Sequence, residues 1–238
     1  AATGASLTSM RCIGLIGGMS WESSALYYQL LNEGVKERLG GLHSARCVLA
    51  SVDFAEIEIM QSEGRWDDAG RLLADTARGL QAAGADAVLI CTNTMHKVAD
   101  QVAAAITVPL LHLADVVADA VVAAGTDTVA LLGTRFTMEE AFYRDRLTAR
   151  GLTVLTPQAD DRALVDRVIY TELVLGQVSE ESRAAYVEII GRLAARGARG
   201  VILGCTEIEL LVRPTDVDLP TFPTTRLHAQ AGVDFALA

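Results

Sequence analysis

The sequence lacks the features of a cross-linked, fibrous or low-complexity protein. Of its 238 residues, 5 are proline and 20 are glycine, which is too few for a collagen-like or disordered composition. Its four cysteines, Cys12, Cys47, Cys91 and Cys205, are widely spaced and form no CxxC pair. The four histidines show no metal-ligand spacing. We therefore expect a globular protein with free thiols and without a metal site.

The sequence also lacks an excess of basic residues and a long apolar run. It has 20 Lys and Arg residues against 30 Asp and Glu residues, a net charge of -10, which argues against nucleic acid as a partner because phosphates attract a basic surface. The most apolar region, residues 108–125, is interrupted by His112, Asp115 and Asp119. No membrane span is predicted.

The first nine residues show neither a basic start nor an apolar segment, so they do not predict a signal peptide. We interpret residues 1–9 as an extension or an expression remnant, with Met10 as the natural start. Together with the free thiols, this indicates a cytoplasmic protein. The mean hydropathy of +0.30 allows a buried homodimer interface without requiring one.

Short apolar runs rich in Val, Ile and Leu alternate with longer amphipathic stretches. Several of the runs are apolar on both faces, which is typical of strands in a covered parallel sheet. The stretches between them have helical spacing, as at Leu73 and Leu80 or at Tyr186 and Ile190. The pattern predicts an α/β fold. The expected strands are residues 11–17, 46–53, 87–91, 109–113, 128–133, 153–156, 200–205 and 220–223.

An internal repeat divides the chain into two similar halves. Residues 14–19 resemble residues 130–134, and residues 83–92 resemble residues 196–206 with one extra residue in the second copy. We therefore expect two pseudo-symmetric, doubly wound domains, each with a four-stranded parallel sheet. The predicted first domain comprises residues 10–113 and 224–238, since the last helix should fold back onto it, and the second domain comprises residues 114–223.

Cys91 and Cys205 follow strands at matching places in the two halves. Ligands of open α/β sheets bind outside the carboxyl ends of the strands, so two facing halves would place two thiols beside one ligand. A helix N-terminus after each cysteine would lower the thiol pKa and favour an anionic ligand. Two opposed thiols suit the inversion of a stereocentre, in which one group removes a proton and the other delivers one.

Several motifs resemble those of the aspartate/glutamate racemase family, which works without pyridoxal phosphate. The resemblance extends from Met10 to the C-terminus and is greatest to the branch of broad-specificity amino-acid racemases. The motifs that carry it are Gly14-Leu-Ile-Gly-Gly-Met-Ser-Trp-Glu-Ser23, Gly40-Gly-Leu-His-Ser44, Cys91-Thr-Asn-Thr-Met-His96, Leu132-Gly-Thr-Arg-Phe-Thr-Met138, Glu172-Leu-Val-Leu-Gly176 and Gly204-Cys-Thr-Glu-Ile-Glu209.

The resemblance implies a cofactor-independent racemase with its active site in the cleft between the domains. It implies that Cys91 and Cys205 are the catalytic acid and base, and that a small-molecule amino acid is the substrate. Glu207 stands where related glutamate racemases carry a histidine, which places the chain on the aspartate-racemase side of the family. The expected substrate-binding residues are Met19, Asp53, Thr92, Asn93, Thr94, Met138, Thr206 and Glu207.

The chain departs from aspartate-specific relatives at two cationic positions. Residues 53–58 contain no base where those relatives carry an arginine, and Val174 aligns roughly with their lysine. A second substrate carboxylate would be left unpaired, so we expect a neutral or basic amino acid: homoserine-like, aliphatic, or lysine or arginine. The alternatives are a maleate-isomerase-like or hydantoin-racemase-like enzyme, and a non-catalytic amino-acid-binding protein.

Overall fold

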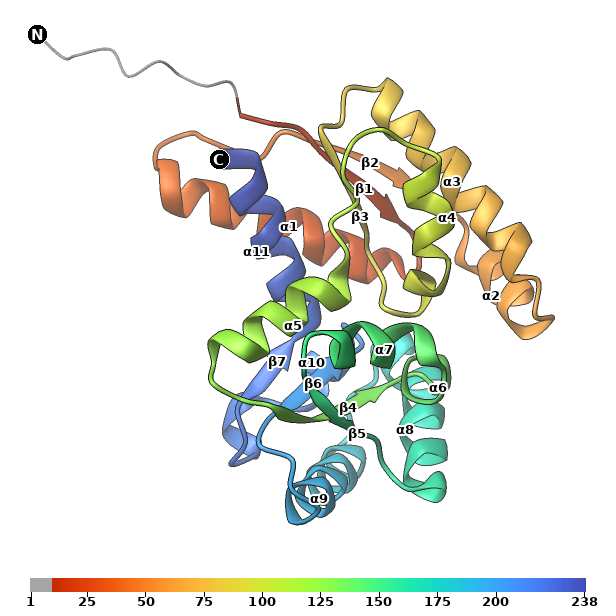
Figure 1. Ribbon diagram of the computed structural model, residues 1–238, viewed down its shortest axis with the longest axis vertical. Helices are drawn as coiled ribbons and strands as arrows, with labels where there is room; N and C mark the ends of the chain where they lie inside the picture. Colours follow the sequence, from red (N-terminus) through yellow and green to blue (C-terminus); the bar gives the residue numbers. More distant parts are fainter. Residues whose placement is uncertain (1–9) are drawn as a thin grey trace, which may run out of the picture.

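The computed structural model describes residues 10–238 and contains two parallel β-sheets with helices on both faces (Figure 1). The interpretation of residues 1–9 therefore lies outside the described residues. The first sheet has the order β2-β1-β3 and consists of β1 (Ile13–Gly17), β2 (Cys47–Ser51) and β3 (Ala87–Ile90). The second has the order β5-β4-β6-β7 and consists of β4 (Thr128–Gly133), β5 (Thr153–Leu155), β6 (Val201–Gly204) and β7 (Thr221–Pro223).

Helices surround both sheets, and none within residues 10–238 is long and apolar enough to cross a membrane. Around the first sheet lie α1 (Trp21–Leu39), α2 (Phe54–Ser62), α3 (Trp66–Ala82), η1 (Thr94–Val98), α4 (Ala99–Ala104) and α11 (Thr224–Leu237). Around the second lie α5 (Leu113–Ala123), α6 (Arg135–Glu139), α7 (Ala141–Ala149), α8 (Ala159–Thr171), η2 (Leu173–Leu175), α9 (Glu180–Ala195), α10 (Ile208–Leu211) and η3 (Pro214–Asp216).

Each sheet has an apolar core on both of its faces, because its strands alternate between two covered sides. In the first domain, Leu15 and Leu89 pack with α1 and α11, whereas Ile16 and Ile90 pack with α3 and α4. In the second domain one core lies under α5 and α7, and the other under α8 and α9. The predicted α/β fold with two doubly wound domains is confirmed.

The first sheet has three strands, so the predicted strand at residues 109–113 is wrong. Leu110 forms a single parallel bridge to Val88. Pro109 has no backbone N–H to extend the ladder, and His112 already caps α5 by accepting a hydrogen bond from the backbone of Ala114. The chain therefore enters a helix where the sequence pattern predicted more strand.

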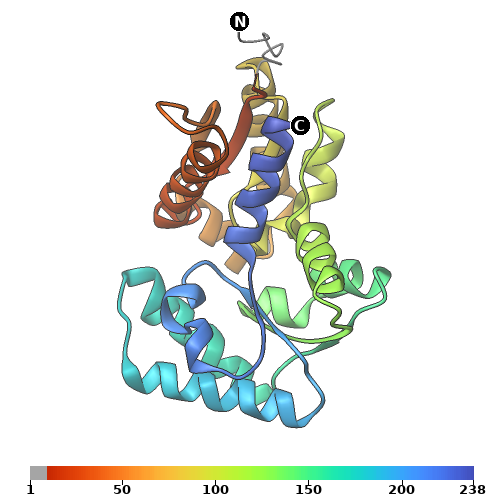
Figure 2. The same cartoon turned by 90° about the vertical axis from the view of Figure 1, so that its left-hand side faces the viewer.

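The C-terminal helix returns to the first domain. α11 packs along α1 over the first sheet (Figure 2). Gly34 permits the close approach, since a Cβ at that position would lie 2.8 Å from a methyl group of Val233. The chain passes from the first sheet to the second ahead of α5, and it returns between β7 and α11. The boundaries at residues 113 and 223 stay a prediction.

A glycine turn sets the carboxyl end of β1. Gly18 has a φ of +93°, and a Cβ there would collide with the carbonyl oxygen of Val52, so the turn requires glycine. Ser20 then caps α1 by accepting a hydrogen bond from the backbone of Ser23. Met19 and Ser20 are thereby held at the edge of the sheet that faces the second domain.

Candidate active site

A small cavity lies between the two domains, at the carboxyl ends of both sheets. Its volume is about 40 Å³. The loops after β1, β3 and β6 contribute most of its wall, together with α2, α8 and η2. We call it the inner cavity. It is lined by Met19, Ser20, Ser23, Phe54, Gln61, Thr92, Asn93, Thr94, Thr134, Ile169, Tyr170, Val174, Gly204, Cys205, Thr206 and Glu207.

Buried hydroxyl groups join the two domains around this cavity. The Ser23 and Thr206 hydroxyls lie 2.8 Å apart, and the Thr94 and Thr134 hydroxyls 2.9 Å apart. Since each pair has one member in each domain, these hydrogen bonds hold the domains in contact. A third bond between the domains runs from Ser20 Oγ to Glu207 Oε1 at 2.9 Å, and within the first domain Asn93 Nδ2 donates to Thr224 Oγ1 at 3.0 Å.

Cys205 presents a protonated thiol to the inner cavity. It follows β6 directly, and its Sγ donates a hydrogen bond to Glu207 Oε2 at 2.9 Å. Burial and then the neighbouring Glu207 carboxylate raise the pKa of the Cys205 thiol well above its usual range. The expected lowering of this pKa by a helix N-terminus is wrong, because α10 has only 4 residues and a carboxylate lies beside the sulfur.

Cys91 does not line the inner cavity. It is fully buried, and it packs with Leu15, Leu89 and Tyr27 in the core between the first sheet and α1. Burial raises the pKa of the Cys91 thiol, contrary to the sequence-based expectation. The structure therefore does not bring Cys91 and Cys205 together at one cavity.

The pairing of the strands shows why the two cysteines differ. In the first sheet Ile16 pairs with Ile90, so Gly17 at the end of β1 is level with Cys91. In the second sheet Gly133, the repeat partner of Gly17, pairs with Gly204. Cys91 is thus equivalent to Gly204, and Thr92 is equivalent to Cys205. The extra residue in the second copy of the repeat shifts the thiol by one position, onto the side that faces the cavity.

Most of the predicted substrate-binding residues do line the inner cavity, namely Met19, Thr92, Asn93, Thr94, Thr206 and Glu207. Two do not. The carboxylate of Asp53 instead caps α2 by accepting a hydrogen bond from Ala55 at 3.0 Å. Met138 is 1% exposed and packs in the apolar core of the second domain. We therefore no longer assign these two residues to substrate binding. Asp53 serves as a helix cap, and Met138 belongs to the apolar core.

Charge is distributed unevenly along the cleft. Within residues 10–238, the lining of the inner cavity contains one carboxylic acid, Glu207, and no lysine, arginine or histidine. A second cavity of about 160 Å³, which we call the outer cavity, shares Gln61 and Tyr170 with the inner one. It adds Glu58, Ser62, Arg135, Phe136 and Asp166. The sequence analysis missed this cavity, since its residues come from α2, α6 and α8.

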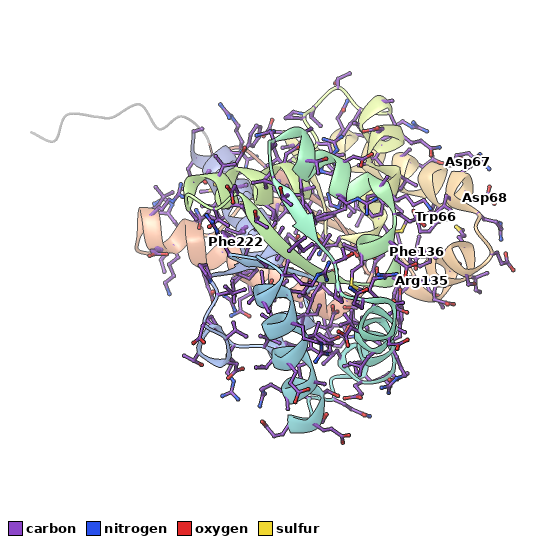
Figure 3. All side chains as sticks on the ribbon, turned by 60° about the horizontal axis from the view of Figure 1, so that its bottom comes forward. Trp66, Asp67, Asp68, Arg135, Phe136 and Phe222 are labelled. Atoms are coloured by element: carbon purple, nitrogen blue, oxygen red, sulfur yellow. The ribbon has the colours of Figure 1, made fainter. Side chains whose placement is uncertain are left out.

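An aromatic and charged cluster joins the domains beside the outer cavity. Trp66 and Phe136 are 5.2 Å apart in an edge-to-face arrangement (Figure 3). Lys97 Nζ lies 3.9 Å from the centre of the Trp66 ring and 2.6 Å from Glu140 Oε2. We call these four residues the Trp66 cluster. Trp66 and Lys97 belong to the first domain and the other two to the second, so the cluster stabilises the closed cleft.

Three neutral histidines support the loop that carries Thr92. His96 donates from Nδ1 to the Thr92 carbonyl at 2.8 Å and accepts from the Leu113 backbone at Nε2. His112 lies against it, with ring centres 4.6 Å apart. His228 donates to the Leu111 carbonyl at 2.6 Å. Burial is the main cause that lowers the pKa of each ring, to about 3 for His112 and about 4 for His228.

Two pseudo-symmetric α/β domains close over a cavity that has a thiol on one side, and this arrangement is the one to compare with known proteins. The family model for Asp/Glu/hydantoin racemases matches residues 16–232. The chain belongs to this family. Membership supports a cofactor-independent racemase, a kind of isomerase, as the class of enzyme.

Solved structures agree with this assignment. A Yersinia pestis protein, provisionally described as an Asp/Glu racemase, is 53% identical with a TM-score of 0.91, and the match covers 96% of this chain and 100% of that one. An aspartate racemase homologue from Pyrococcus horikoshii is 31% identical with a TM-score of 0.84, covering 95% and 99%. Glutamate racemase from Francisella tularensis, solved with D-glutamate, is 15% identical with a TM-score of 0.64 over 93% and 79%, and shows the fold alone.

Proposed function

We propose that the protein is an amino-acid racemase that moves the Cα proton of its substrate in the inner cavity. The observation that carries this proposal is the equivalence of Thr92 and Cys205 at the ends of two facing sheets, both lining one cavity. The hypothesis of a Cys91–Cys205 pair is replaced by a Thr92–Cys205 pair, since the Cys91 thiol lies in the core.

We assign Glu207 the role of binding the ammonium group of the substrate. Its carboxylate is buried and lines the cavity, where a cation would pair with it. The unpartnered Oδ1 of Asn93 is a second acceptor in the same wall. The ammonium charge would offset the effect of Glu207 on Cys205 and lower the pKa of the thiol. With the pKa lowered, the Cys205 thiol releases its proton to solvent as the substrate binds, and this gives the thiolate that acts as the base.

In the proposed reaction, the Cys205 thiolate takes the Cα proton, so that the Cα–H bond breaks and an S–H bond forms. The electron pair stays on the α-carbon and spreads into the α-carboxylate, which the hydroxyls of Thr94 and Thr206 stabilise. A proton delivered from the side of Thr92, by its hydroxyl or by a water bound to it, gives the enantiomer. The alkoxide or hydroxide left behind then takes a proton from solvent, and the Cys205 thiol releases its new proton to solvent. A hydroxyl is a far weaker acid than a thiol, so exchange at the Cys205 face should be faster than inversion.

The lining of the inner cavity favours a substrate with a neutral or basic side chain. Val174, Ile169 and Phe54 supply apolar surface, and no lysine or arginine lines this cavity. A side-chain carboxylate would there meet Glu207 and no cation. Arg135 stands farther out, in a cavity that also carries Glu58 and Asp166. Broad specificity is consistent with such a wall.

The test is incorporation of deuterium at Cα in heavy water across the twenty amino acids. We expect exchange with several neutral or basic amino acids and its loss in Cys205→Ala. Cys47→Ala, which removes a thiol from a strand of the first sheet, is the matched control. Binding without exchange of any amino acid would show a non-catalytic binding protein, and clear preference for aspartate would refute the substrate assignment.

A further inference from the structure

Gln61 is a polar residue at a position where α2 should be apolar. α2 buries two side chains, Ile57 and Gln61, which lie four residues apart on the face toward the core. Gln61 is 6% exposed. Apolar residues occupy such positions unless a buried polar group has a partner. The presence of glutamine therefore needs an explanation from its surroundings.

The hydrogen bonding of the Gln61 amide is incomplete. Its Nε2 donates to the thioether sulfur of Met95 at 3.0 Å, and sulfur is a weak acceptor. No hydrogen bond to Gln61 Oε1 is formed within residues 10–238. Since the Met95 sulfur holds the nitrogen end of the amide, the oxygen end is left free to accept a hydrogen bond from a bound molecule.

The position of Gln61 relates this oxygen to the proposed substrate. Gln61 and Tyr170 line both the inner and the outer cavity, so they stand at the junction between them. When the α-carbon of a substrate lies near Cys205, its side chain can extend toward this junction. Beyond it, the outer cavity carries two carboxylates, Glu58 and Asp166, and one cation, Arg135, so acceptors outnumber the cation there.

We propose that Gln61 determines the specificity of the enzyme by accepting a hydrogen bond from the substrate side chain. The substrate class is therefore amino acids whose side chain carries a hydroxyl, amide or ammonium donor. Isosteric alkyl side chains would cover the Gln61 amide oxygen without pairing it, and side-chain carboxylates would bring two acceptors together. This inference rests on the proposed racemase activity.

The test compares matched substrates in the Cα exchange assay: serine with 2-aminobutyrate, homoserine with norvaline, and glutamine with glutamate. We expect kcat/KM to favour the donor-bearing member of at least one alkyl pair by about tenfold or more, and glutamine over glutamate. Alanine is the reference substrate, because its side chain carries no hydrogen-bonding group. No exchange with any amino acid would overturn the proposed racemase itself. Exchange of all substrates without preference for donors would overturn the role of Gln61 alone.

Two substitutions make the assignment specific to this residue. Gln61→Met keeps the length of the side chain and removes the amide acceptor, so the ratio of kcat/KM between the two members of each alkyl pair should fall toward one. Gln61→Glu keeps an acceptor and should retain the preference for donors. Gln29→Met makes the same change on the exposed face of α1 and should behave as the unmodified protein. An unchanged preference in Gln61→Met would refute the proposal.

Discussion

Acid should destabilise this protein through its buried histidines. In an unfolded chain a histidine titrates near pH 6.5. In the folded protein, burial and then the cation of Arg146 lower the pKa of His112 to about 3, and burial lowers that of His228 to about 4. Between these values and 6.5 the unfolded chain binds more protons than the folded one. Stability is therefore full above pH 6.5 and is lost as the pH falls.

The size of the effect follows from these pKa values. Lowering the pH from 7 to 5 should remove roughly 2 kcal/mol of unfolding free energy for each of His112 and His228. Glu209 acts in the opposite direction, because burial raises its pKa to about 7. Its folded form binds a proton in this range and regains about 2 kcal/mol. The net loss of unfolding free energy between pH 7 and pH 5 is therefore smaller than the contribution of the histidines. A variant is needed to measure the histidine contribution by itself.

His112→Asn is the variant that separates these contributions. Asparagine still offers an oxygen to cap α5 but does not titrate. We expect urea unfolding at pH 7 and pH 5 to show that His112→Asn loses about 2 kcal/mol less than the unmodified protein over this interval. His43→Gln removes an exposed histidine and is the control. An equal loss in His112→Asn and the unmodified protein would refute the reasoning.

Three further changes test other parts of the structure. Lys97→Met removes the ion pair and the cation–π contact of the Trp66 cluster, so KM in the exchange assay should rise about threefold or more with little change in kcat; an unchanged KM would contradict the role of the cluster. Gly18→Ala should destabilise the fold by more than about 2 kcal/mol in urea, against about 1 for Gly64→Ala, where a Cβ meets nothing within 4 Å. Glu209→Gln should lower the pKa of Cys205, measured as alkylation of its peptide against pH, whereas an unmoved pH profile would exclude the coupling.

Much of the fold could be predicted from local patterns. Strands such as residues 128–133 are apolar on both faces, and buried parallel strands show this pattern because helices cover them on both sides. The missing strand at residues 109–113 has the same composition. What distinguishes it is Pro109, which cannot donate to a ladder, and His112, which starts α5. The start of a helix at this point therefore prevents the apolar residues from forming a strand.

The site was harder to predict, because it depends on which face a residue occupies. Cys91 and Cys205 align in the repeat, but the extra residue means that Thr92 reaches the cavity where Cys205 does. The pairing of the strands decides which of the two residues faces the cavity, and this pairing cannot be read from the sequence. Gln61 and Arg135 lie 74 positions apart in the chain and meet only through tertiary packing.

The most direct test of the central claim measures Cα deuterium exchange and inversion separately in three variants. The account predicts that Cys205→Ala loses both, that Cys91→Ala keeps both apart from a modest loss of stability, and that Thr92→Cys raises the rate of inversion toward that of exchange. Inversion that disappears in Cys91→Ala while Thr92→Val leaves it unchanged would contradict the account.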